Sequence, residues 1–221
     1  GYFSHGFSHI NETIAHAVHD FRLYMDYLED LGAPQIGVTG ISLGGHFAPR
    51  AVAYEPRFAS GACWGANHNW REVQDKRMRR EGENPVPHYW AHVFWAFGAR
   101  DMDDFLAKSA DMNLNGHMDR IKVPFLVTHG ANDRQISPSY ADDLYDQLIN
   151  SPRREKVIFT AREGGVEHVG ADNMAYGCDC IADWFADYTR IVAQRLGDRL
   201  WSTAPINEPW CVAWLSHFLG I

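Results

Sequence analysis

Hydrophobic residues recur at helical spacing near the start of the chain. The spacing is alternately four and three residues between Ile14, Val18, Phe21, Met25 and Leu28. Such a stripe predicts an amphipathic helix over residues 11–31. Asn11 suits the N-cap of this helix, and a glycine at position 32 suits its end.

Four short apolar segments have the length and composition of buried strands. They occupy residues 36–39, 59–64, 123–128 and 156–160. Helices are predicted between and after them: one up to about residue 54, one beginning with Ser137 as N-cap and Pro138 in its first turn, and one from about residue 173. The last helix is expected to bury Cys178, Ile181, Phe185 and Tyr188. Alternating strands and helices predict a mostly parallel sheet with helices on both faces.

Residues 67–118 differ in texture from the rest of the chain. They contain many aromatic residues and scattered charges, and they lack a strand pattern. We therefore predict a core formed by residues 1–66 and 119–196, interrupted by a helical lid insertion at 67–118. Residues 197–221 are expected to form a C-terminal tail that packs on the core.

Composition excludes several functional classes. The net charge of −8 argues against nucleic acid, which needs a basic surface, and no apolar run approaches the length of a membrane span. Twelve histidines do not form a recognisable metal-binding pattern, so neither a metal nor a cofactor is expected. Four cysteines are a low number, which fits a reducing, cytoplasmic location.

Gly40-Ile41-Ser42-Leu43-Gly44 matches the pattern G-x-S-x-G between a predicted strand and a predicted helix. A serine hydroxyl needs a tight turn to stand clear of the sheet, and small neighbours leave room for that turn. The backbone N–H of Leu43 would then stabilise an oxyanion. The alternative is a glycine-rich packing turn with an idle serine.

An acid and a histidine follow the serine in the order that this arrangement requires. Asp133 comes shortly after the third predicted strand, and His168 lies in a glycine-containing loop after the fourth. The carboxylate can orient the imidazole, which acts as general base toward Ser42. The alternatives are that Asp133 only caps a turn and that His168 is a surface residue without a catalytic role.

The insertion would lie over Ser42 because it leaves the sheet at a carboxyl end. His68, Trp70 and Glu72 follow that end directly, and Trp95 belongs to the aromatic stretch, so these four are candidates for contact with a small-molecule substrate. For any single aromatic residue, ordinary packing within the insertion is the competing interpretation.

The segment from Val38 to Ala186 resembles the α/β-hydrolase family that includes 2,6-dihydroxypseudooxynicotine hydrolase and the fungal hydrolases that shorten polyketide pigment precursors. The likeness depends on five kinds of segment: Gly40-Ile-Ser-Leu-Gly-Gly, Trp95-Ala-Phe-Gly with Leu114-Asn-Gly, the run from Val123 to Asp133, Glu163-Gly-Gly-Val-Glu-His, and Ala182-Asp-Trp-Phe. The resemblance implies an esterase or a hydrolase of carbon–carbon bonds beside a ketone, with Ser42, Asp133 and His168 as its triad.

This sequence departs from that fold in one respect. The fold normally has several strands before the nucleophile, and a loop there supplies a second oxyanion donor. Here one helix precedes the first predicted strand, whose apolar edge would be open. We therefore expect that the N-terminal strands are missing from a partial chain, or that another polypeptide, such as a second copy, covers the edge.

Two functions remain open at this stage. The first is a serine hydrolase acting on an ester or on a ketone-adjacent bond of an acylated aromatic or polyketide-like substrate. The second is a catalytically silent ligand-binding protein on the same scaffold, which lacks a complete oxyanion hole.

Overall fold

The computed structural model describes residues 10–33, 35–80 and 87–196. Four strands form one sheet in the order β1-β2-β3-β4, and every neighbouring pair is parallel. The strands are β1 (Ile36–Ile41), β2 (Phe58–Trp64), β3 (Phe125–Gly130) and β4 (Arg154–Phe159). The parallel α/β architecture predicted from the alternating pattern is confirmed.

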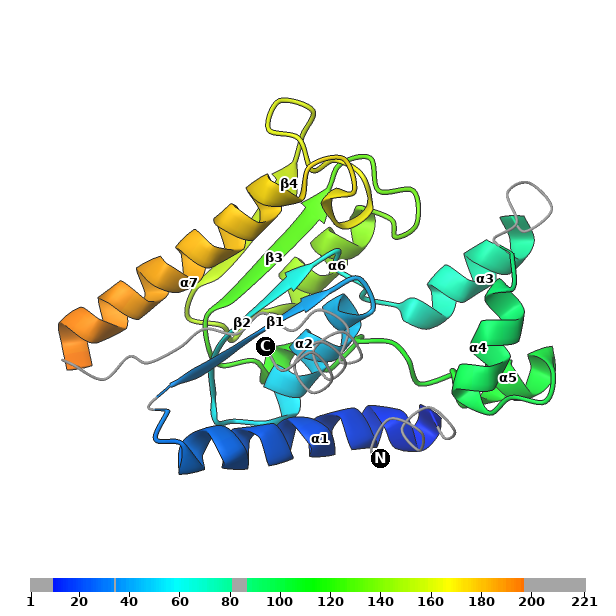
Figure 1. The fold of residues 1–221 in the computed structure, drawn as a ribbon, viewed down its shortest axis with the longest axis horizontal. Coiled ribbons are helices and arrows are strands. Elements are labelled where there is room, and N and C mark those ends of the chain that lie inside the picture. The colour runs from blue at the N-terminus through cyan, green and yellow to red at the C-terminus, as the bar shows by residue number, and fades with distance from the viewer. Residues whose placement is uncertain (1–9, 34, 81–86, 197–221) are drawn as a thin grey trace, which may run out of the picture.

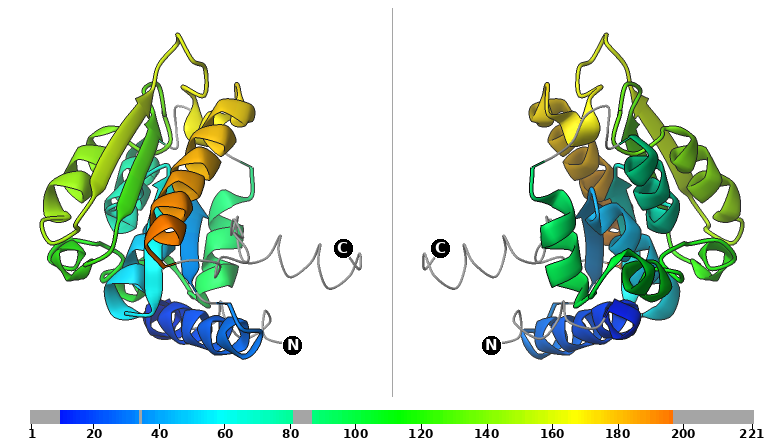
Figure 2. Two further views of the ribbon diagram at one scale, coloured as in Figure 1. Left: turned by 90° about the vertical axis from the view of Figure 1, so that its left-hand side faces the viewer. Right: turned by 90° about the vertical axis from the view of Figure 1, so that its right-hand side faces the viewer.

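Helices cover both faces of this sheet (Figures 1 and 2). One face packs against α1 (Ile10–Asp30), α2 (Gly44–Tyr54) and α6 (Ser139–Gln147), in a core that includes Met25, Phe125 and Leu144. The other face packs against α7 (Met174–Leu196). Successive residues of a strand therefore point into opposite cores, because side chains alternate between the two faces of a sheet.

The segment between β2 and β3 forms helices, as predicted. Its elements are α3 (Trp70–Arg80), α4 (Tyr89–Phe97), α5 (Met102–Lys108) and the short 3-10 helix η1 (Met118–Arg120). Figure 1 shows α3, α4 and α5 grouped to one side of the sheet. An isolated antiparallel bridge between Asn69 and Asn113 joins the two ends of this group. We call residues 67–118 the insertion.

An aromatic core of its own holds the insertion together. The Phe105 side chain is fully buried, and four other aromatic rings lie around it, with centroids 5.0–6.2 Å away: Trp70, Trp90, Phe94 and Phe97. Leu43 and Phe47, beside the predicted nucleophile, pack against this cluster. The insertion is therefore attached to the body next to Ser42.

The predicted burial of Cys178 is wrong, because this cysteine is exposed. Gly177 faces the sheet instead, and a Cβ atom there would lie 2.3 Å from the Trp64 ring. The next residue is turned by about 100° around the helix axis, away from the sheet. Ile181 and Phe185 are buried as predicted.

Several predicted boundaries shift by one or two residues. Ile10 already belongs to α1, so Asn11 lies inside the helix and is not its N-cap. β3 begins at Phe125 and continues through Gly130, because Pro124 lacks an N–H for the ladder. Ser137 does not cap α6: its hydroxyl contacts that of Ser139 at 2.8 Å. The tail predicted for residues 197–221 lies outside the described residues.

Candidate active site

Ser42 lies at the turn between β1 and α2 in a left-handed backbone conformation. Its φ angle is +58°, a region that L-residues other than glycine rarely adopt and that stores strain. The Ser42 N–H donates to the Trp64 carbonyl at 2.9 Å, which ties the turn to the end of β2. The serine hydroxyl is thereby presented at the carboxyl ends of the strands.

Two glycines make this turn sterically possible. A Cβ atom at Gly40 would lie 2.0 Å from the Gly44 carbonyl oxygen, and one at Gly45 would lie 2.2 Å from the Gly65 carbonyl oxygen. Both contacts are far inside van der Waals range and involve backbone atoms, which cannot move aside. The sequence pattern predicts that Gly40 and Gly44 leave room for the turn. The crowding at Gly40 is confirmed, that at Gly44 stays a prediction, and Gly45, which lies outside the G-x-S-x-G pattern, was not predicted.

The structure brings Ser42, His168 and Asp133 into one chain of hydrogen bonds. The Ser42 hydroxyl lies 2.8 Å from His168 Nε2, and His168 Nδ1 lies 2.8 Å from Asp133 Oδ2. With a proton on Nδ1, the imidazole donates to the carboxylate and its Nε2 accepts from the serine. Residues from three loops, distant in the sequence, therefore meet within proton-transfer distance.

The Asp133 carboxylate is buried but well supplied with donors. Oδ1 accepts from the backbone N–H groups of Gln135 and Ile136 at 2.8 and 2.9 Å. Burial acts to raise the pKa of Asp133, but the hydrogen bonds from His168 and these two N–H groups outweigh it, and the pKa is lowered. The carboxylate thus stays ionised beside the imidazole.

A second histidine lies behind the acid. His129 is fully buried, and its Nε2–H donates to the Ile136 carbonyl at 3.0 Å and lies 3.4 Å from Asp133 Oδ2. Burial lowers the pKa of His129, so it is neutral at neutral pH. The sequence gives it no separate prediction, since it appears there only within the run from Val123 to Asp133.

The Leu43 N–H, the predicted oxyanion donor, lies at the start of α2, and its role stays a prediction. Leu43 precedes α2, and in the part of the chain that the structure describes its N–H donates to no protein acceptor. The first N–H groups of a helix are free in this way and carry its positive dipole end. A negative oxygen next to Ser42 would meet this field.

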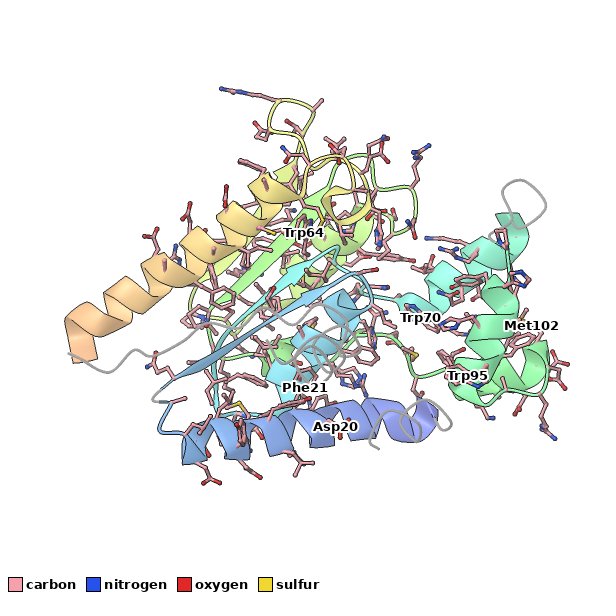
Figure 3. All side chains as sticks on the ribbon, in the orientation of Figure 1. Asp20, Phe21, Trp64, Trp70, Trp95 and Met102 are labelled. Atoms are coloured by element: carbon pink, nitrogen blue, oxygen red, sulfur yellow. The ribbon has the colours of Figure 1, made fainter. Side chains whose placement is uncertain are left out.

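Three of the four predicted substrate contacts bond to or stack on other residues in this structure, and the fourth is exposed. His68 Nε2 bonds to Asn115 Oδ1 at 2.9 Å, and Glu72 accepts from the Tyr140 hydroxyl at 2.7 Å. Trp70 stacks on Phe97 in the aromatic core, whereas the Trp95 side chain is exposed on the same insertion (Figure 3). Contact with substrate stays a prediction for all four.

Among residues 10–33, 35–80 and 87–196, no group of three or more His, Cys, Asp or Glu side chains is arranged to hold a metal ion. In the same ranges, none of the helices combines the length and apolarity needed to cross a bilayer.

Comparison with known proteins gives a family and a fold. Residues 10–191 match the prolyl oligopeptidase family. A puromycin-hydrolysing peptidase of Mycobacterium tuberculosis superimposes with a TM-score of 0.59 at 18% identity, covering 86% of this chain and 27% of that one. An esterase of Pyrococcus furiosus gives 0.54 at 15% identity over 80% and 60% of the two chains. An α/β hydrolase from a lagoon-sediment metagenome gives 0.52 at 18% identity over 78% and 71%.

At these identities the structural likeness shows the α/β-hydrolase fold alone. Curated sequences give short matches of a different kind. A β-glucosidase of Agrobacterium sp. is 35% identical over 81 residues, which are 36% of this chain and 18% of that protein. β-Glucosidase A of Thermotoga maritima is 46% identical over 41 residues, or 19% of this chain and 9% of that protein. The chain thus spans less than a fifth of the length of these curated relatives, and the matches assign no family.

Proposed function

The chain belongs to the prolyl oligopeptidase family, and on that premise we propose that it is a serine hydrolase whose triad is Ser42, His168 and Asp133. One observation carries the proposal: a serine on a strained left-handed turn, hydrogen-bonded to an imidazole that is itself hydrogen-bonded to a buried carboxylate. An idle serine in a packing turn has no need of either partner.

In the proposed reaction, the Ser42 oxygen attacks a substrate carbonyl while His168 Nε2 takes the hydroxyl proton. The carbonyl oxygen becomes negative and is stabilised by the Leu43 N–H. The tetrahedral intermediate collapses, the bond to the leaving group breaks, and His168 returns the proton to that group. Water then attacks the acyl-serine by the same steps and releases the acid.

The substrate class is proposed from the resemblance and the family together. Esters and carbon–carbon bonds beside a ketone, in acylated aromatic or polyketide-like molecules, follow from the likeness to the pseudooxynicotine and pigment-precursor hydrolases. The family also suggests small peptides. The same triad serves all three because each begins with attack on a carbonyl. We favour esters and ketones, acted on without a cofactor in a reducing, cytoplasmic setting.

The first test uses the purified chain and a p-nitrophenyl ester. Ser42→Ala should abolish turnover and labelling by a fluorophosphonate probe, because no other serine is bonded to His168 in the described structure. Retained turnover or labelling in this variant would refute the assignment. A prolyl p-nitroanilide measured in parallel distinguishes ester from peptide substrates.

A catalytically silent binding protein is the second candidate. Leu43 supplies one backbone donor at the turn, whereas hydrolases of this fold use two. A folded wild-type chain that neither turns over esters nor reacts with the fluorophosphonate would favour this candidate. Labelling of the wild type that is lost in Ser42→Ala would exclude it.

A further inference from the structure

We propose that Glu167 is a positioning residue that clamps the loop of His168 to the loop of Asp133. This inference rests on the proposed triad. Glu167 immediately precedes the histidine in the chain, and the two residues that bind its carboxylate, Asn132 and Arg134, stand on either side of the aspartate. The clamp therefore joins the direct chain neighbours of the two triad members.

The contacts of the clamp are specific to each carboxylate oxygen. Asn132 Nδ2 donates to Glu167 Oε1 at 2.6 Å, and Arg134 Nη2 donates to Glu167 Oε2 at 3.2 Å. The backbone adds a third link, since the Asn132 N–H donates to the Val166 carbonyl at 2.9 Å. The two loops are thus held together at several points within a few residues of the triad.

Close backbone approach makes this link possible. A Cβ atom at Gly130 would lie 2.4 Å from the Val166 carbonyl oxygen. Any side chain at this position would force the His168 loop away from the end of β3. The absence of a side chain at Gly130 lets the loops come near enough for Glu167 to reach Asn132.

The His168 loop needs external support because its own backbone is strained. Val169 has a φ angle of +44°, and Gly164, Gly165 and Gly170 are also left-handed. A β-branched residue in this region is strained, and relaxation of the loop would release that strain. Without a link to the rest of the site, such relaxation would carry the imidazole with it.

Asp172 shapes the same loop but does not connect it to the acid. Its carboxylate accepts from the backbone N–H groups of Gly165, Val166 and Glu167 at 2.9, 3.2 and 2.9 Å. All three donors belong to the His168 loop. Among the side chains of the described loop, Glu167 is the one whose hydrogen bonds cross to residues 132 and 134.

The two arms of the clamp differ in expected strength. The Arg134 side chain is 80% exposed, and an exposed ion pair contributes little. The Glu167 side chain is 28% exposed, and its bond to Asn132 is short. The Asn132 arm should therefore dominate. If the Asn132 hydrogen bond matters more than the Arg134 ion pair, Glu167 acts by holding the two loops together and not by its charge near the site.

The test measures ester hydrolysis and fluorophosphonate labelling of the full chain. Glu167→Ala should lower kcat about tenfold with KM unchanged, because a small displacement of the base slows proton transfer without affecting ground-state binding. Labelling of Ser42 should slow by a similar factor. Glu167→Gln retains an oxygen that accepts from Asn132, so it should restore most of kcat.

Three further variants keep the outcome decisive: Asn132→Ala, its combination with Glu167→Ala, and Glu163→Ala. Asn132→Ala should reproduce the loss, and the double variant should be no slower than either single one, because both remove the same bond. Glu163→Ala is the matched control, since Glu163 lies in the same loop but bonds to Thr160. If Glu167→Ala fails to fold, the Asn132→Ala variant carries the test.

The outcomes separate this inference from the proposed function. A wild-type chain without turnover or labelling would refute the triad, and the clamp with it. An active wild type in which Glu167→Ala and Asn132→Ala keep full kcat would overturn the clamp alone. Equal losses in Glu167→Ala and Glu163→Ala would also overturn it, because they would indicate a general loosening of the loop.

Discussion

At the scale of single residues, the turn around Ser42 shows how backbone and side-chain requirements interlock. The left-handed φ of the serine is stable only because its neighbours leave space for the returning chain. Trp64 contributes twice: its carbonyl accepts from Ser42, and its ring packs against Gly170 just after the His168 turn. The proposed nucleophile and the proposed base thus share one supporting residue.

Gly40→Ala should disrupt this turn. The new methyl group would lie 2.0 Å from a backbone oxygen and 2.8 Å from the Ala48 Cβ, an overlap that costs about 1–3 kcal/mol or more. We expect a lowered melting temperature and loss of fluorophosphonate labelling. Gly32→Ala is the control, because nothing lies within 4 Å of that position and its left-handed φ alone is penalised. Labelling of Gly40→Ala at the wild-type rate would contradict the steric argument.

The predicted triad residues were identifiable from the sequence because each follows a strand end in a known order. Glu167, Asn132 and Gly45 were not, since their roles depend on which loops approach each other. His129 was equally unpredictable: nothing in the sequence of this strand indicates that the ring of its histidine lies behind the Asp133 carboxylate. Contacts between loops arise from tertiary packing, which local patterns do not encode.

At the scale of elements, the insertion behaves as a small helical unit with its own core. Phe105→Ala removes the ring at its centre, which lies against four other aromatic rings. The free energy of opening of α4 and α5, measured by native-state hydrogen exchange, should fall by about 3–5 kcal/mol.

Trp95→Ala provides the comparison on the same insertion. Its side chain is 71% exposed, so the change should stay within about 0.5 kcal/mol. Equal losses of stability in the two variants would contradict this argument, because they would show that an exposed ring stabilises the insertion as much as a buried one. The sequence predicted helices here but could not tell which aromatic rings point inward, because nearly every position of α4 is apolar.

The rotation of α7 about its axis also depends on contacts that the local sequence does not show. The hydrophobic period predicts a buried stripe on this helix but does not fix the rotation of the helix about its axis. The prediction that Cys178 faces the sheet is therefore wrong. The deciding contact is between Gly177 and the Trp64 ring, residues more than a hundred positions apart. Such long-range contacts explain why the sequence predicts where helices and strands occur better than it predicts which side of each helix is buried.

At the scale of the whole molecule, acid stability should depend on His46. Burial lowers the pKa of this histidine from 6.5 to about 3, and the charge of Arg50 adds to the effect. The folded protein keeps His46 neutral, whereas the unfolded chain takes up a proton below pH 6.5. Stability is therefore fully present above pH 6.5 and is lost as the pH falls toward 3.

His46→Gln should remove this dependence. In urea titrations between pH 7 and pH 4, the stability difference between wild type and variant should change by about 1.4 kcal/mol per pH unit below 6.5, with the wild type losing more. His92→Gln, at an exposed position on α4, is the control. Parallel stability curves for wild type and His46→Gln would contradict a buried neutral His46.

The edge of the sheet leads to a separate proposal. Among the described strands, β1 pairs with β2 alone, and Tyr27 of α1 and Leu31, just after that helix, are exposed. We propose that another polypeptide, in the simplest case a second copy, covers this side. Sedimentation should detect association of the wild type that Tyr27→Lys with Leu31→Lys weakens. A monomer at all concentrations would reject the second copy.

The aromatic core of the insertion has a consequence for how members of this family diversify. Helices α4 and α5 pack on this aromatic core, which adjoins the proposed nucleophile through Leu43 and Phe47, whereas Leu114 and Met118 of the same insertion belong to the core of the sheet. The outer residues of α4 and α5 are therefore the ones that can change without disturbing the sheet. Selection for a new substrate could therefore change α4 and α5 while the proposed triad keeps its geometry. Replacing residues 89–108, which hold α4 and α5, while keeping Leu114 and Met118 in the sheet core, is accordingly the most direct experimental route to altered selectivity.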